Sequence, residues 1–158
     1  MGNNQTPQAN SGYLLGSFSL VDKAATNCEI SFVVTNLATK KESIIPFIAD
    51  NKKGDELIQL SPGPYEISGY IFADHSGKMD NTRPINGFIG DKGKFTLEAG
   101  KGLFIGDWVV TLDVKSSDLS ARYVTSSFAF TFKAFQAAVN SARVTYPAFN
   151  SLEFTSLR

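Results

Sequence analysis

The segment from Leu60 to Phe72 constrains the fold of this chain more than any other part of the sequence. It opens with a proline–glycine turn, Pro62-Gly63-Pro64, and continues into residues that alternate between apolar and polar. Adjacent proline and glycine favour a tight turn, and alternation with a period of two is typical of a half-buried strand. The sequence therefore predicts a tight corner between two β-strands.

The rest of the chain repeats this strand pattern. Turn-rich segments separate about eight expected strands at intervals of roughly 8–12 residues, which is typical of an all-β sandwich or barrel. Proline cannot donate a hydrogen bond to a neighbouring strand, so Pro46 predicts an edge strand or a bulge in its segment. Gly69 predicts a kink in another strand. The expected strands are Tyr13–Val21, Glu29–Leu37, Glu42–Ile48, Glu56–Leu60, Tyr65–Phe72, Lys94–Glu98, Leu103–Val114 and Tyr123–Phe132.

The pattern changes after Lys133. Apolar residues then recur at i, i+3, i+4 and i+7, which predicts one face of a short amphipathic helix that ends ahead of Pro147. These residues are Phe135, Ala138, Val139 and Ala142. A single helical pattern argues against a parallel α/β fold. We therefore expect a mainly β protein: an antiparallel β-sandwich, prealbumin-like or immunoglobulin-like, with one short C-terminal α-helix.

Composition agrees with a folded β domain. The 158 residues are 42% hydrophobic and 19% charged, and 13 of them are phenylalanine, a residue type that suits half-buried strands. Residues 2–12 are polar, small and uncharged, so we expect residues 1–12 to be a flexible tether and residues 13–158 to be a single domain. Such a leader is also found behind the lipidated cysteine of bacterial lipoproteins, which suggests a lipid anchor upstream of Met1.

Charge and cysteine content exclude several classes of protein. Fifteen basic and fifteen acidic residues cancel, so the chain lacks the positive charge that nucleic-acid binding requires. No apolar run approaches the roughly 20 residues of a transmembrane helix. The single cysteine, Cys28, rules out an internal disulfide and is expected to be a small strand or core residue.

The sequence contains few candidates for catalysis or metal binding. His75 is the only histidine. Its neighbours Asp74 and Ser76 cannot form a catalytic triad with it, because adjacent loop residues cannot take that geometry with one another. A metal site normally needs more than one imidazole or thiolate. We therefore expect no enzyme activity and no cofactor, and we expect His75 to be an ordinary loop residue, while keeping it as a candidate contact.

A second candidate site lies around Asp107 and Trp108. Trp108 is expected to be a core residue; if it were exposed beside Tyr70 or Phe104, it would be able to stack on a sugar ring or anchor a partner. Asp107, between Gly106 and Trp108, is expected to help turn or bulge its strand. The candidate ligand or partner residues are Trp108, Asp107, Tyr70, Phe104 and His75.

Three motifs mark corners of the expected strands: Leu60-x-Pro-Gly-x-Tyr65, the segment Phe95-x-Leu-x-Ala-Gly-x-Gly-x-Phe-Ile-Gly-Asp107, and the closing pair Tyr146-Pro147. This set resembles motifs of bacterial envelope proteins and lipoproteins with a transthyretin-like, or carboxypeptidase-regulatory-like, β-sandwich. The resemblance covers about residues 16–147 and departs at Phe104, where those proteins usually have tyrosine. The motifs mark strand corners and carry no catalytic residue, so the resemblance implies fold and location more than activity.

Two functions from different classes follow. The first is a non-enzymatic module in the bacterial cell envelope, periplasmic or attached to the outer membrane, that binds another protein or acts as a scaffold. The alternative is a sandwich that binds carbohydrate or another small ligand through Trp108, Tyr70 and Tyr123. An exposed, coplanar aromatic patch would favour the alternative, and aromatic residues used up by the core would contradict it.

Overall fold

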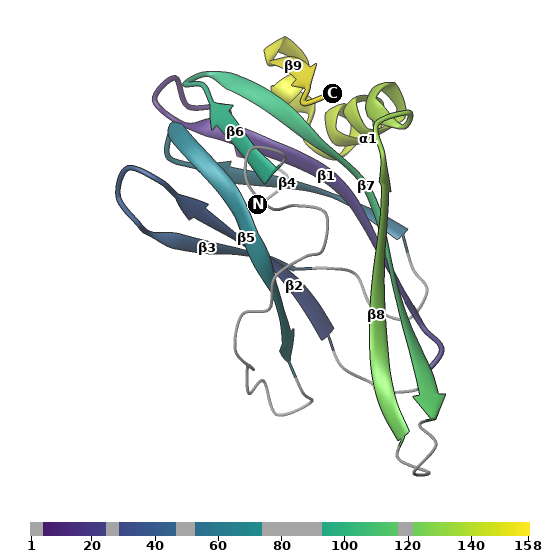
Figure 1. The fold of residues 1–158 in the computed structure, drawn as a ribbon. Coiled ribbons are helices and arrows are strands. Elements are labelled where there is room, and N and C mark those ends of the chain that lie inside the picture. Colours follow the sequence, from purple (N-terminus) through teal and green to yellow (C-terminus); the bar gives the residue numbers. More distant parts are fainter. Residues whose placement is uncertain (1–4, 25–28, 47–52, 74–92, 117–121) are drawn as a thin grey trace.

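The chain folds into two β-sheets that pack against each other, with one α-helix near the C-terminus (Figure 1). The structure, a computed structural model, describes residues 5–24, 29–46, 53–73, 93–116 and 122–158. Within these ranges it contains nine strands, and all eight segments that the sequence predicts as strands form them. The mainly β prediction is therefore confirmed.

The first sheet has the order β4-β1-β7-β8, and β9 also pairs with β7. Its strands are β1 (Gly12–Asp22), β4 (Lys53–Leu60), β7 (Lys101–Ser116), β8 (Arg122–Thr131) and β9 (Glu153–Ser156). Strand β7 runs parallel to β1 and β9, whereas the pairs β1–β4 and β7–β8 are antiparallel. The expectation of purely antiparallel sheets is wrong here, because the chain passes through the second sheet between β1 and β7. Such a crossover can bring two strands together in parallel.

The second sheet is antiparallel throughout, as expected. Its order is β3-β2-β5-β6, formed by β3 (Glu42–Pro46), β2 (Glu29–Asn36), β5 (Gly63–Ala73) and β6 (Lys94–Leu97). Strand β3 lies at the edge of this sheet and ends at Pro46. The prediction of an edge strand from that proline is therefore confirmed.

The main hydrophobic core fills the space between the two sheets. Trp108 lies at its centre and is fully buried, with its ring edge-on to Phe32 and stacked against Phe130. Its indole nitrogen donates a hydrogen bond of 3.0 Å to the backbone oxygen of Ile105. The expectation that Trp108 is a core residue is confirmed.

A second hydrophobic cluster covers the opposite face of the first sheet. Helix α1 (Phe135–Thr145) and the short 3-10 helix η2 (Pro147–Ser151) pack on this face, close to β1, β4 and β7 (Figure 1). The predicted helix is confirmed, and its buried residues Ala138, Val139 and Ala142 are three of the four that the periodicity selects. The first sheet is thus covered on both faces near this end.

Two bulges adjust the strands at glycine residues. In β7 the register against β1 shifts by one residue at Gly106, which has a φ of 120°. In β5 the register against β2 shifts beside Gly69, which has a φ of 157°. Glycine adopts such backbone angles without the strain that a side chain would cause. The predicted kink at Gly69 and the predicted bulge beside Asp107 are both present.

Candidate functional site

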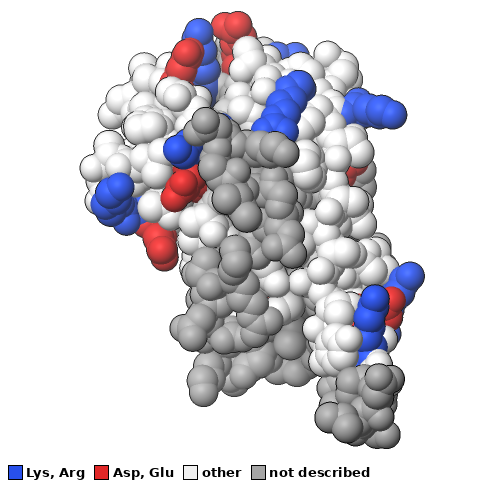
Figure 2. Space-filling model, viewed as in Figure 1, with Lys and Arg blue, Asp and Glu red and all other residues white. Residues whose placement is uncertain are grey.

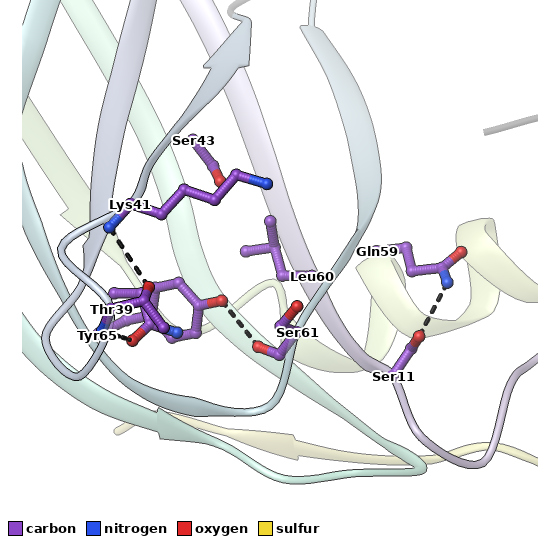
Figure 3. Close-up of a pocket in the computed structure, with 9 residues that line it drawn as sticks. Ser11, Thr39, Lys41, Ser43, Gln59, Leu60, Ser61 and Tyr65 are labelled. Carbon is purple, nitrogen blue, oxygen red and sulfur yellow. Dashed lines mark hydrogen bonds between the residues drawn. The ribbon is translucent and has the colours of Figure 1, made fainter.

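A polar hollow lies at one end of the two sheets (Figure 3) and has a volume of about 520 Å³. It lies between the turn that joins β2 to β3 and the corner that joins β4 to β5. The described residues that line it are Ser11, Asn36, Thr39, Lys41, Ser43, Gln59, Leu60, Ser61 and Tyr65. No carboxylate is among these lining residues, so they supply no acid–base pair for hydrolysis.

The β2–β3 turn fixes one wall of the hollow. The side-chain oxygen of the buried Asn36 accepts hydrogen bonds from the backbone nitrogens of Ala38 (2.9 Å) and Thr39 (3.1 Å). Asparagine favours turns because its side chain can form hydrogen bonds with the backbone of residues that follow it in the chain. Lys40 takes a left-handed conformation, with a φ of 63°, and the chain then reverses into β3. This turn places the exposed Lys41 on the rim of the hollow.

The proline–glycine corner fixes the other wall. The hydroxyl of Tyr65 donates a 2.7 Å hydrogen bond to the backbone oxygen of Ser61, which closes the corner (Figure 3). The Gln59 amide nitrogen donates hydrogen bonds to Ser11 (2.8 Å) and Gln8 (3.0 Å). The hollow therefore presents hydroxyl and amide groups and one ammonium group, which suit a polar ligand.

A second candidate site is the outer edge of β8. This strand is at the end of the sheet order and has β7 as its only partner among the described strands. Three large apolar side chains on it are exposed: Tyr123 (49%), Val124 (47%) and Phe130 (37%). Residues 123–131 contain no charge and no proline. Figure 2 shows an uncharged surface along β8 down to the charged side chains near its lower end.

Lys, Pro and inward-pointing charges are the usual devices that stop an edge strand from pairing with another chain. Strand β8 lacks these devices over nine consecutive residues, from Tyr123 to Thr131. One end of β8 extends with β7 as a two-stranded ribbon (Figure 1). Strand β1 pairs with β7 only as far as Leu112, whereas β8 pairs with β7 as far as Ser116. The edge is therefore long, and no described strand pairs along its outer side.

The structure places most of the candidate aromatic residues inside the protein. Trp108 and Phe104 are fully buried, and Tyr70 is 7% exposed. Phe104 faces the helix-side cluster, on the opposite face of the sheet from Trp108, so the two do not form one patch. Tyr70 instead joins the two sheets, since its hydroxyl lies 2.9 Å from that of Ser126 on β8.

Asp107 and the remaining candidates have other placements. Asp107 is half-buried directly after the bulge, and it aligns with Ser17 on β1 and Thr131 on β8. His75 and Cys28 lie outside the residues that the structure describes. Among the described residues, no group of three or more His, Cys, Asp and Glu side chains is arranged to hold a metal ion.

Sequence reasoning missed two exposed residues of the β8 edge, Val124 and Phe130. The signal was present as a nine-residue strand pattern without a charge or a proline. Period-two alternation does not say whether a strand is central or at an edge, so the sequence pointed to Pro46 as the edge marker instead. Tyr123 was singled out, but as a sugar-stacking residue.

Comparisons with known proteins give little guidance. The sequence matches no protein-family model and no curated protein. A solved leucine-rich repeat protein from Bacteroides thetaiotaomicron is similar over 66% of this chain, with 23% identity and a TM-score of 0.39, and the chain spans 12% of that protein's length. A likeness this low carries no argument about fold family or function. In the described part of the chain, no helix is long and apolar enough to cross a membrane.

Proposed function

We propose that this protein is a non-enzymatic β-sandwich module of the bacterial cell envelope, of lipoprotein type and transthyretin-like, that acts in protein interaction or scaffolding. The observation that carries the interaction role is the unprotected edge of β8, with Tyr123, Val124 and Phe130 exposed on it. The burial of Trp108, Phe104 and Tyr70 adds support, because these rings are used by the core and do not form a sugar-binding platform.

Strand addition gives a physical basis for this role. An extended segment of a partner that lies beside β8 forms main-chain hydrogen bonds with the outward-facing N–H and C=O groups of the strand. Alternate side chains of β8 then provide specificity, since successive residues point to opposite faces of the sheet. Val124 and Phe130 lie on one face, and Tyr123 lies on the other. A partner strand would cover exposed apolar surface on both faces.

Site-specific photo-crosslinking in the native cells tests the interaction role. A photoreactive phenylalanine analogue at Val124 is expected to give a discrete protein adduct. The matched control is the same analogue at Val144, which is 81% exposed on α1, away from the sheet edge. Adducts at Val124 but not at Val144 support the proposal. Equal labelling at both positions, or none at Val124, contradicts it.

The cellular location rests on the resemblance and on the polar leader, and it needs its own test. We expect protein isolated from native cells to carry a diacylated cysteine just ahead of the present sequence and to fractionate with the envelope. Intact-mass and N-terminal analysis measure this directly. An unmodified or formylated Met1 would remove the envelope proposal and leave the interaction proposal intact.

The polar hollow favours one alternative, the binding of a carbohydrate or another small polar ligand. Its support is the cluster of hydroxyl and amide groups around Lys41 and Gln59, and not the aromatic residues expected from the sequence. A glycan panel followed by NMR chemical shifts tests it. Shifts confined to the backbone amides of Thr39, Lys41 and Ser61, and absent in a Lys41→Ala variant, would support a ligand site there.

A further inference from the structure

The sequence of β8 suits pairing with a second copy of the same strand. We infer that β8 pairs antiparallel with β8 of a second copy of this chain, with Ser127 of one copy opposite Ser127 of the other. This inference rests on the proposed interaction role of the edge and names the partner. The resulting dimer would join the two first sheets into one continuous sheet.

Symmetry limits how two identical edge strands can pair. A two-fold axis perpendicular to the sheet makes the pairing antiparallel and keeps each face of the sheet on the same side. Two-fold symmetry is the commonest symmetry of assemblies of identical subunits. Residues that lie opposite each other on two paired strands point to the same face of the sheet. Since successive residues alternate between the faces, the two opposite residues must have numbers that are both even or both odd, and the sum of the two numbers is even. Each allowed register has one residue that lies opposite itself.

Centring the pair on Ser127 matches the exposed apolar side chains. Val124 of one copy then lies opposite Phe130 of the other, and this contact occurs twice. Both side chains are exposed in the single chain, at 47% and 37%. An aromatic residue opposite a β-branched residue is a favourable cross-strand pair. On the other face, Tyr123 lies opposite Thr131.

The neighbouring registers are less suitable. A centre at Ser126 places Val124 opposite Phe128, whose ring packs against Tyr70 and Phe32 and is less exposed than that of Phe130. The Phe130 ring stacks on Trp108 but keeps 37% of its surface exposed. A centre at Phe128 places Val124 opposite Phe132, which lies beyond the end of β8 and packs on the helix-side cluster. Among the registers centred on residues 126 to 128, only the one centred on Ser127 joins two large exposed apolar side chains.

Charge does not oppose this pairing. Residues 123–131 are uncharged, so no like charges face each other along the paired strands. The whole chain has a formal net charge of zero, which removes long-range repulsion between copies. The position most sensitive to charge is Ser127, because in this register a charge there lies directly opposite its own copy.

A charge-swap experiment follows from this geometry. We expect sedimentation equilibrium of the wild-type protein to show a dimer, and Ser127→Lys and Ser127→Asp each to weaken it by about fivefold or more through like-charge repulsion. An equimolar mixture of the two variants should recover association as a heterodimer. Ser127 is exposed, so both variants should fold, and circular dichroism checks this. The matched controls are Ala137→Lys and Ala137→Asp, on an exposed position of α1, which should leave the dimer unchanged.

Three outcomes would overturn the inference. These are a wild-type protein that stays monomeric at up to about millimolar concentration, a dimer indifferent to both Ser127 variants, and variants that do not recover association when mixed. The proposed function is tested separately by the crosslink from Val124. A monomer that still crosslinks to a different protein refutes the second copy as the partner but leaves the interaction role standing.

Discussion

The two ends of β7 lie in opposite environments, although they belong to one continuous strand. At its start, near Gly102 and Phe104, β9 pairs along its edge, and α1 and η2 cover its outer face. At its far end, residues 113–116 pair only with β8 among the described strands, and no described helix packs there. The first end buries large aromatic side chains, whereas at the second end Tyr123 and Val124 of β8 are exposed.

This difference separates a part of the molecule that contributes to stability from the part that we propose for binding. The covered end contains an interlocked group of rings, with Tyr13 edge-on to Phe149 at a centroid distance of 4.9 Å. Arg143 adds a hydrogen bond of 3.2 Å to the backbone oxygen of Leu152, which ties the helix to the segment before β9. The C-terminal segment therefore closes one end of the sheet, while the other end keeps an open edge.

The largest effect is expected from emptying the covered end. Phe149→Ala removes a fully buried ring and should lower the free energy of unfolding by about 3–5 kcal/mol, through lost burial and a cavity. Urea unfolding followed by circular dichroism measures this loss. Val144→Ser, on the exposed side of α1, is the control and should stay within about 0.5 kcal/mol of wild type. Equal losses in both variants would show that the helix does not pack as described.

A smaller loss is expected from overpacking the β7–β9 contact. A side chain at Gly102 would collide with the ring of Phe154 on β9. Gly102→Ala should therefore cost about 1–3 kcal/mol and displace β9 from β7. Hydrogen exchange of the β9 amides should accelerate more than that of the β1 amides, which lie between two partner strands. Unchanged exchange at β9 would contradict this pairing.

The open end should tolerate substitution that the covered end does not. Val124→Ser exposes no new core surface and should change the free energy of unfolding of the monomer by no more than about 0.5 kcal/mol. The same variant should weaken dimerisation. Urea unfolding at low protein concentration and sedimentation at high concentration separate the two effects. A large loss of monomer stability would mean that Val124 belongs to the core.

The smallest effect concerns a surface ion pair at the start of β7. The ammonium of Lys101 lies 3.0 Å from the Glu98 carboxylate. Three interactions raise the pKa of Lys101: the hydrogen bond to Glu98, the negative charge of Glu98 and the negative charge of Glu153. The associated stabilisation is present below the pKa of lysine in the unfolded chain and is lost as pH rises through the raised value. Both side chains are largely exposed, so the contribution to stability is small.

Glu98→Gln tests this pair directly. It should lower the pKa of Lys101 toward its ordinary value, as measured by NMR titration of the lysine side chain. Glu153→Gln should lower it less, because the Glu153 charge is the weakest of the three favourable causes. If Glu153→Gln lowered the pKa of Lys101 more than Glu98→Gln does, the charge on β9, and not the charge in the turn before β7, would make the larger contribution to the electrostatic potential at Lys101.

Local pattern predicted the strands well and their neighbours poorly. The alternation from Tyr123 onward marked β8, and the spacing from Phe135 marked α1, because both signals lie within one element. The parallel pairing of β1 with β7 joins residues about 90 positions apart, such as Phe18 and Trp108. No short-range pattern specifies such a contact. The exposure of Val124 and Phe130 was unpredictable for the same reason, since the exposure of a strand residue depends on which strands are its neighbours.

The sequence by itself determined the strand segments, the proline–glycine corner at Pro62, the kink at Gly69 and the restriction that Pro46 places on pairing in its strand. Each of these follows from backbone geometry or side-chain chemistry at one place in the chain. Only the tertiary structure decided that one sheet is mixed, that the C-terminal segment covers one end of it, and that β8 lies at its edge. Strand neighbours are set by packing between distant segments, and this packing leaves β8 at the edge of the first sheet among the described strands.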